Sequence, residues 1–156
     1  VFEQCKKENI NIKIIQQCIK SQTEKLKKTY KDLNFDFKLF NFTNNILEYF
    51  LKTELAITRS GSSVTAELIN CNIPFICIPY PHAADAHQDK NASYFEKMGY
   101  SLSIKETEVN KKLFPLIKSF YKNKKLLNKI IKKQQKHSDK EVFFKINKVI
   151  KSLINE

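Results

Sequence analysis

Arginine, glycine and tryptophan are scarce in this 156-residue chain, which has two glycines, no tryptophan and a single arginine, Arg59. No run of about 18 apolar residues occurs, so we expect no membrane-spanning segment. The start, VFEQCKKENI, has neither an initiator methionine nor the apolar region of a secretory leader. We expect these residues to be the end of a helix whose beginning lies upstream, in a chain truncated at this point.

The four cysteines show no CxxC pair and no spacing typical of metal ligands. Two of them, Cys71 and Cys77, stand in apolar runs and are expected to be small buried hydrophobic residues. The two remaining thiols are Cys5 and Cys18. This pattern predicts no metal site and a reduced, cytosolic setting.

The formal net charge of +12 raises the possibility of a nucleic-acid-binding module. All of the basic residues except Arg59 are lysine, whereas base recognition favours the bidentate arginine side chain. We therefore interpret the charge as a solvated surface with weak attraction for anionic lipid headgroups. Nucleic-acid binding stays open as the less favoured alternative.

The order of the periodic segments is typical of an α/β protein. Short apolar or alternating stretches predict strands, and amphipathic stretches between them predict helices. Strands are expected at 11–17, 35–40, 55–58, 75–78 and 101–104, with helices at 21–33, 46–51, 62–71 and 85–98. Gly99 is expected to end the helix at 85–98 with a left-handed C-cap.

Alternating strands and helices predict a Rossmann-like parallel sheet with helices on both faces, and a sixth strand is expected before Val1. We assign residues 1–109 to this domain and residues 110–156 to a helical extension that packs on it. The extension carries two apolar stripes that are expected to face the core. The first is Leu113, Leu116, Ile117 and Phe120; the second is Val142, Ile146, Val149, Ile150 and Leu153.

Ligands of such sheets bind at the carboxyl ends of the strands, which directs attention to the turn RSGSS after residue 58. Gly61 permits a sharp turn into the following helix. The first residues of that helix, Ser62, Ser63 and Val64, have unpaired N–H groups that can bind a phosphate. Glu67 lies just over a turn further on, where a carboxylate can accept hydrogen bonds from a ribose diol. An ordinary loop with a serine N-cap is the alternative.

A second turn, PYPHAADAHQDKNA, follows the strand at 75–78. Asp85 is expected to cap the next helix, with Gln88 in capping-box register. Gln88 and Asn91 share one helix face and can present amide groups to sugar hydroxyls. His82 is expected to support the proline-rich loop. No Ser-His-Asp arrangement can be recognised from the spacing.

Together, TRSGSSVTAEL and NIPFICIPYPHAADAHQDKNA resemble the carboxy-terminal, donor-binding domain of the bacterial glycosyltransferases that convert lipid I to lipid II. The pattern of that family is close to R-(S/A)-G-x-x-x-x-x-E followed by P-(Y/F)-P-H-A-A-D-x-H-Q-x-x-N-A. Weaker similarity extends through IIQQC and NFTNNI. The family's glycine-rich loop and its amino-terminal domain have no counterpart in these residues.

The resemblance implies a role for particular residues in binding UDP-N-acetylglucosamine. Thr43 matches a residue that meets uracil through its backbone, Glu67 matches the ribose-binding carboxylate, and Gln88 matches a contact to the donor sugar. Asn91 is a second sugar contact by the same reasoning, with Arg59, Gly61 and His82 in supporting positions. Contacts to the diphosphate are implied for Ser62, Ser63, Val64, Thr65 and Ala66.

The resemblance also implies inverting transfer of N-acetylglucosamine to undecaprenyl-pyrophosphoryl-muramyl-pentapeptide, with no cofactor and no metal. The acceptor would bind the absent domain, at the cytoplasmic face of the bacterial inner membrane. This chain alone is then expected to be inactive, and we identify no general base in it. The donor-binding subunit of a split UDP-sugar glycosyltransferase is the alternative within the transferases.

Overall fold

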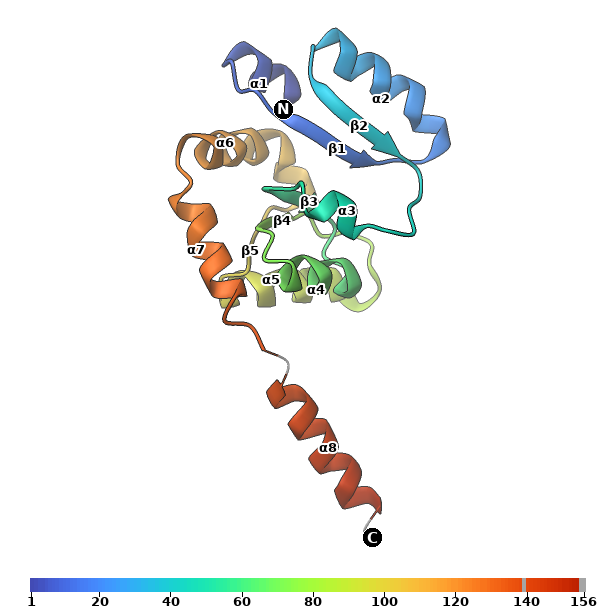
Figure 1. Ribbon diagram of the computed structural model, residues 1–156, viewed down its shortest axis with the longest axis vertical. Coiled ribbons are helices and arrows are strands. Elements are labelled where there is room, and N and C mark those ends of the chain that lie inside the picture. Colours follow the sequence, from blue (N-terminus) through green and yellow to red (C-terminus); the bar gives the residue numbers. More distant parts are fainter. Residues whose placement is uncertain (139, 155–156) are drawn as a thin grey trace.

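The computed structural model describes residues 1–138 and 140–154, apart from the side chains of residues 140–143. Helices and strands alternate through the first two thirds of the chain, and helices alone follow (Figure 1). The strands are β1 (Lys13–Gln17), β2 (Asp36–Phe40), β3 (Ala56–Thr58), β4 (Phe75–Cys77) and β5 (Ser101–Ser103). The helices are α1 (Phe2–Lys7), α2 (Lys20–Asp32), α3 (Leu47–Phe50), α4 (Ser62–Asn70), α5 (His87–Met98), α6 (Val109–Lys122), α7 (Lys125–Gln134) and α8 (Lys140–Ile154), with 3-10 turns η1 (Ala84–Ala86) and η2 (Glu106–Glu108).

Every strand pair is parallel, which confirms the predicted α/β class. The hydrogen-bonded strands form two ladders, β1 with β2 and β3-β4-β5 in that order. The ladders lie in the same body of the protein, one above the other in Figure 1. The five strands fall within one or two residues of their predicted ranges.

Strand β4 is the most deeply buried strand, because helices cover both of its faces. Phe75, Ile76 and Cys77 are all fully buried. Ile76 packs in a cluster with apolar residues of α6 and α7, whereas Phe75 and Cys77 pack with residues of α4 and α5. Successive side chains of a strand point to opposite faces, so this division places α6 and α7 on one face and α4 and α5 on the other.

Helix α5 ends at Gly99, as predicted. Gly99 adopts φ 76°, and the N–H of the next residue, Tyr100, returns to the carbonyl of Phe95. Glycine takes this left-handed conformation without steric cost, which explains the placement of one of the two glycines.

The start of α5 differs from the prediction. Asp85 does not cap the helix: it has φ 49° and lies inside the 3-10 turn η1, while Ala86 at φ 50° is the N-cap residue, with no side-chain cap bond. The capping-box prediction for Asp85 and Gln88 was therefore wrong. Two successive left-handed residues that are not glycine instead turn the chain sharply into the helix.

The helical extension divides into a packed part and an exposed part. Leu113, Ile117 and Phe120 of α6 are buried in the main cluster, and Gln134 of α7 donates hydrogen bonds to the carbonyls of Ile73 and Tyr100. Helix α8 extends away from the body (Figure 1). Its described apolar side chains are exposed, including Ile146, Val149, Ile150 and Leu153, so the prediction that these four residues pack on the core was wrong. The Val142 side chain lies outside the described residues, and the division at residue 109 stays a prediction.

No helix in the described part of the chain is long and apolar enough to cross a membrane. The cysteines are free, and Cys77 is buried as expected, whereas Cys71 is only half-buried.

Candidate functional site

The turn between β3 and α4 is built around an extended residue, Gly61, which is the N-cap of α4 at φ −69° and ψ 140°. A Cβ at this position would meet no atom within 4 Å, so glycine is not required by space or by backbone conformation. Behind the turn, Thr65 is completely buried. Its hydroxyl donates to the carbonyls of Gly61 at 2.7 Å and Ser62 at 3.0 Å, and its N–H donates to Gly61 at 3.2 Å.

These bonds change the role predicted for Thr65. Both of its donors are used inside the first turn of α4, so Thr65 supports the turn and does not offer a donor to a diphosphate. Ser62 and Ser63 are exposed and Val64 is half-buried, and no side chain caps the helix. Because these three residues lie in the first turn of the helix, their N–H groups have no carbonyl partner within the helix. They are therefore free to bind an anion.

Asn91 ties α5 to this turn. Its side-chain amide donates to the carbonyl of Ser60 at 2.9 Å, and Ser60 is completely buried. This bond uses one of the two hydrogens of the Asn91 amide, and the sugar contact expected for Asn91 stays a prediction. The bond joins the two segments that carry the sequence motifs.

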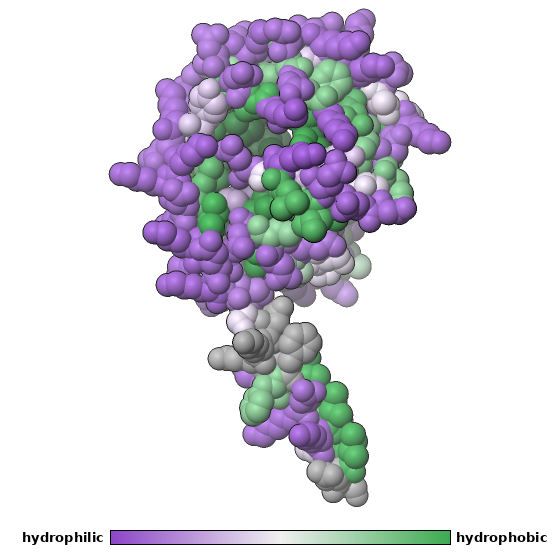
Figure 2. All heavy atoms as spheres, in the orientation of Figure 1, coloured by the Kyte–Doolittle hydropathy of each residue, from purple (hydrophilic) through white to green (hydrophobic). Residues whose placement is uncertain are grey.

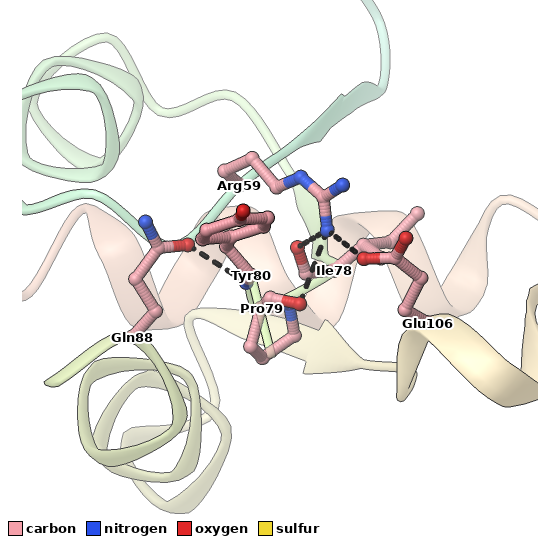
Figure 3. Close-up of polar contacts among 6 residues, drawn as sticks. All are labelled: Arg59, Ile78, Pro79, Tyr80, Gln88 and Glu106. Carbon is pink, nitrogen blue, oxygen red and sulfur yellow. Dashed lines mark hydrogen bonds and ion pairs between the residues drawn. The ribbon is translucent and has the colours of Figure 1, made fainter. Parts of the chain in front are cut away.

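Arg59 also joins the two segments that carry the sequence motifs (Figure 3). One terminal nitrogen, Nη1, donates to the carbonyls of Ile78 at 3.2 Å and Pro79 at 3.1 Å and to the Glu106 carboxylate at 2.6 Å. The guanidinium group also lies over the Tyr80 ring, 5.5 Å from its centroid. Arg59 therefore ties the end of β3 to the loop after β4 and to the turn η2.

Gln88 faces the loop after β4. Its side-chain oxygen accepts a hydrogen bond from the Tyr80 N–H at 3.0 Å, and Figure 3 shows its amide nitrogen directed away from that bond. The oxygen thus fixes the orientation of the side chain, and the NH₂ group is left to donate to a ligand. His82 is exposed and packs edge-on against the Tyr80 ring, with 5.6 Å between centroids.

The remaining predicted residues lie apart from this hydrogen-bonded group. Glu67 and Ala66 are exposed on α4, and the Glu67 carboxylate makes no ion pair among the described residues. Thr43 follows β2, and its hydroxyl accepts the N–H of Asn45 at 3.0 Å. Its backbone remains available for the contact that the resemblance implies.

Three contributors were missed at the sequence level. Glu106 lies 47 residues from Arg59, and Tyr80 stands between two prolines without any pattern that marks a contact. Ser60 is completely buried, and its hydroxyl has no hydrogen-bond partner within the structure. Only the position of Ser60 beside the motif residues Arg59 and Gly61 hinted at a role.

The described residues contain no group of three or more His, Cys, Asp and Glu side chains placed to hold a metal ion. The chemistry that the site offers is therefore that of backbone N–H groups, serine hydroxyls, one carboxylate and one amide.

The sequence matches a family model and named relatives. The model of the glycosyltransferase family 28 C-terminal domain matches residues 1–145. A Pelagibacter ubique protein named UDP-N-acetylglucosamine–N-acetylmuramyl-(pentapeptide) pyrophosphoryl-undecaprenol N-acetylglucosamine transferase is 37% identical over 151 residues, which cover 95% of this chain and 42% of the relative. A Campylobacter jejuni protein of the same name is 40% identical over 100 residues, 64% of this chain and 29% of that protein.

The fold has a solved counterpart. The crystal structure of Acinetobacter baumannii MurG matches with a TM-score of 0.74 at 20% identity, over 88% of this chain and 40% of the MurG chain. The present chain thus spans less than half of the relatives it matches. The family model covers nearly all of the sequence, and on that ground the chain belongs to the glycosyltransferase family 28 C-terminal domain family.

Proposed function

We propose that this chain is the donor-binding half of a UDP-N-acetylglucosamine-dependent hexosyltransferase that converts lipid I to lipid II by inverting transfer. The named activity of the Pelagibacter and Campylobacter relatives supports this assignment. The other half of the relatives, which this chain does not match, would bind the lipid-linked acceptor at the inner-membrane surface. The chain alone would then bind the donor without turnover.

The observation that carries the proposal is the pair of side chains that fix the β3–α4 turn. Asn91 holds the Ser60 carbonyl, and Arg59 holds the carbonyls of Ile78 and Pro79. These three bonds orient the backbone around the uncapped start of α4, which lies at the carboxyl end of β3. Fixed N–H dipoles stabilise the charge that develops on a leaving diphosphate without reorganising during the reaction.

In this proposal each contact has one task. The N–H groups of Ser62, Ser63 and Val64 bind the diphosphate, Glu67 accepts both ribose hydroxyls, and Gln88 donates its free NH₂ to the sugar. Thr43 meets the uracil through its backbone. No metal or other cofactor is required, because the donors already carry the positive end of the helix dipole.

Calorimetric titration of the chain with UDP-N-acetylglucosamine tests the proposal. We expect saturable binding that weakens in Glu67→Ala and, to a smaller extent, in Gln88→Ala. Glu24→Ala, at an exposed glutamate of α2, is the matched control and should bind like the wild type. Wild-type affinity in both site variants, or no binding by the wild-type chain, would contradict the assignment.

A split UDP-sugar glycosyltransferase, with its acceptor half on another polypeptide, predicts the same donor binding. The two possibilities differ in the gene: in a split enzyme, the reading frame that encodes this chain does not encode the acceptor half. A basic nucleic-acid-binding module predicts instead a steep loss of oligonucleotide affinity with added salt, and no binding of the UDP-sugar.

A further inference from the structure

The connection from β2 to α3, residues 41–46, begins where the ladder of β1 and β2 ends (Figure 1). The parallel register stops at the pair of Gln17 and Phe40, and the Cys18 N–H adds one backbone bond to the Phe40 carbonyl at 2.9 Å. Beyond that bond, no backbone hydrogen bond joins the two segments in the part of the chain that the structure describes. The connection therefore starts at the carboxyl end of the ladder, which is the side of a parallel sheet where ligands bind.

Two side-chain amides continue the pairing beyond the end of the ladder. The Asn41 side chain donates to the Cys18 carbonyl at 2.7 Å, and the Gln17 side chain donates to the Asn41 carbonyl at 3.1 Å. The Asn41 amide also lies 3.4 Å from the Thr23 hydroxyl of α2. Because the first two bonds run in opposite directions between the segments, they fix both the side chain and the backbone of Asn41. We call these two bonds the amide clamp.

The far end of the connection is held by an aromatic contact. The rings of Phe40 and Tyr49 are stacked, with 4.3 Å between centroids and 7° between planes. Lys38 Nζ lies over the same Tyr49 ring, 4.8 Å from its centroid. Ring stacking and a cation over an aromatic face both stabilise such a contact. Helix α3 is thus held against the end of β2, and the residues between Asn41 and Tyr49 form a loop that is fixed on both sides.

Thr43 lies inside this loop with its backbone unpaired. Its hydroxyl accepts the Asn45 N–H at 3.0 Å, but its own N–H and carbonyl make no hydrogen bond among the described residues. One N–H donor and one carbonyl acceptor match the edge of uracil, on which O4 accepts and N3–H donates. Cytosine reverses this pattern, with an amino donor and a ring nitrogen that accepts. Discrimination between the two bases by this backbone therefore depends on where the loop holds it.

We propose that Asn41 is a positioning residue for base selectivity: through the amide clamp it holds the Thr43 backbone where uracil is bound in preference to cytosine. Asn41 acts through the loop and does not touch the base itself. The inference rests on the proposed function, in which Thr43 meets the uracil. It adds that selectivity for the base depends on a contact between the ends of β1 and β2.

Titrations with UDP and CDP test the positioning role. Asn41→Ala removes the bond to Cys18, and Gln17→Ala removes the bond to Asn41. Both side chains are exposed, in a body whose surface is mostly hydrophilic in the view of Figure 2, so neither substitution opens a cavity. We expect the affinity for UDP to fall about two- to tenfold in each variant, and the affinity for CDP to change much less. Asn128→Ala, at an exposed asparagine of α7, is the matched control and should keep the wild-type ratio of the two affinities.

The ratio of UDP to CDP affinity separates positioning from a general loss of structure, because weaker folding alone lowers both affinities together. A wild-type ratio in both Asn41→Ala and Gln17→Ala would overturn the positioning role while leaving the proposed function intact. Absence of UDP binding by the wild-type chain would instead contradict the proposed function. Equal wild-type affinities for UDP and CDP would contradict the contact between Thr43 and the base.

A second measurement needs no ligand. The ¹⁵N order parameter of the Thr43 amide in the free protein reports whether the loop is held on the ps–ns timescale. We expect a value of about 0.85 in the wild type and in Asn128→Ala, and a fall toward about 0.6 in Asn41→Ala and Gln17→Ala. The same value in all four proteins would show that the amide clamp does not hold the loop, and would overturn the proposal whatever the chain binds.

Discussion

The side-chain amide nitrogen of Asn91 lies 2.9 Å from the carbonyl oxygen of Ser60, a bond that joins the first turns of α5 to the turn before α4. We expect Asn91→Ala to loosen that turn and to leave a buried carbonyl unpaired, at a cost of about 1–3 kcal/mol in unfolding free energy. The affinity for UDP-N-acetylglucosamine should fall as well, because the loosened turn carries the N–H groups proposed to bind the diphosphate. Urea denaturation and calorimetry measure the two effects.

Ser93→Ala on the same helix is the control for Asn91→Ala, because Ser93 is exposed. It should change neither stability nor affinity. A stable Asn91→Ala protein with wild-type affinity would show that the bond does not position the turn.

Arg59 and Glu106 form an ion pair at 2.6 Å in which both side chains are about half exposed. Solvent screening limits such a pair to below about 1 kcal/mol, so the two backbone bonds of Arg59 should matter more. We expect Arg59→Lys to destabilise the chain more than Glu106→Gln does, since both carbonyl bonds start from the terminal nitrogen Nη1, which the shorter lysine side chain does not reach in the same place. A double-mutant cycle of Arg59→Lys and Glu106→Gln, measured by urea denaturation, separates the ion pair from the two carbonyl bonds. A coupling energy that accounts for the whole loss of stability in Arg59→Lys would contradict this ranking.

The side-chain oxygen of Gln88 accepts a hydrogen bond from the Tyr80 N–H, and its NH₂ group can still donate to a ligand. Gln88→Glu keeps an acceptor for that N–H and removes the donors. We therefore expect affinity for UDP-N-acetylglucosamine to fall about tenfold or less while affinity for UDP stays nearly constant. Parallel titrations with the two ligands provide the comparison, and an equal loss for both would place Gln88 away from the sugar.

Local sequence rules predicted the elements of this chain well and their connections poorly. The apolar run at β4 and the glycine at the end of α5 depend on neighbouring residues only, and both were predicted correctly. The Arg59–Glu106 and Asn91–Ser60 contacts join residues 47 and 31 positions apart. No periodicity encodes such contacts, because they arise only when the strands pair.

The failures have a similar cause. Asp85 has the residue type and spacing of an N-cap, but its backbone adopts φ 49°, so the chain enters α5 through Ala86. The α8 stripe has the helical period of a core face, yet those of its side chains that the structure describes are exposed. Periodicity identifies an apolar face and does not identify the surface that will cover it.

Cys77 provides a test of burial that is independent of the ligand. Burial raises the pKa of its thiol to about 11, from an ordinary value of 9.0. The folded state thus holds the proton more tightly than the unfolded state, so the stabilisation is complete below about pH 9 and is lost as the pH rises toward 11. Urea denaturation at pH 8 and pH 10 should show a larger loss of stability in the wild type than in Cys77→Ala. The same loss in both proteins would count against burial as the cause.

Helix α8 should contribute little to the stability of the body. Phe144 and Leu153 are 72% and 69% exposed, so ending the chain after residue 143 removes described side chains that bury little surface. We expect the free energy of unfolding to change by no more than about 0.5 kcal/mol. By contrast, Leu127→Ala in α7, where the side chain is 6% exposed, should cost about 2–5 kcal/mol by opening a cavity. Denaturation midpoints compare the two, and a large loss on truncation would mean that α8 packs on the body in solution.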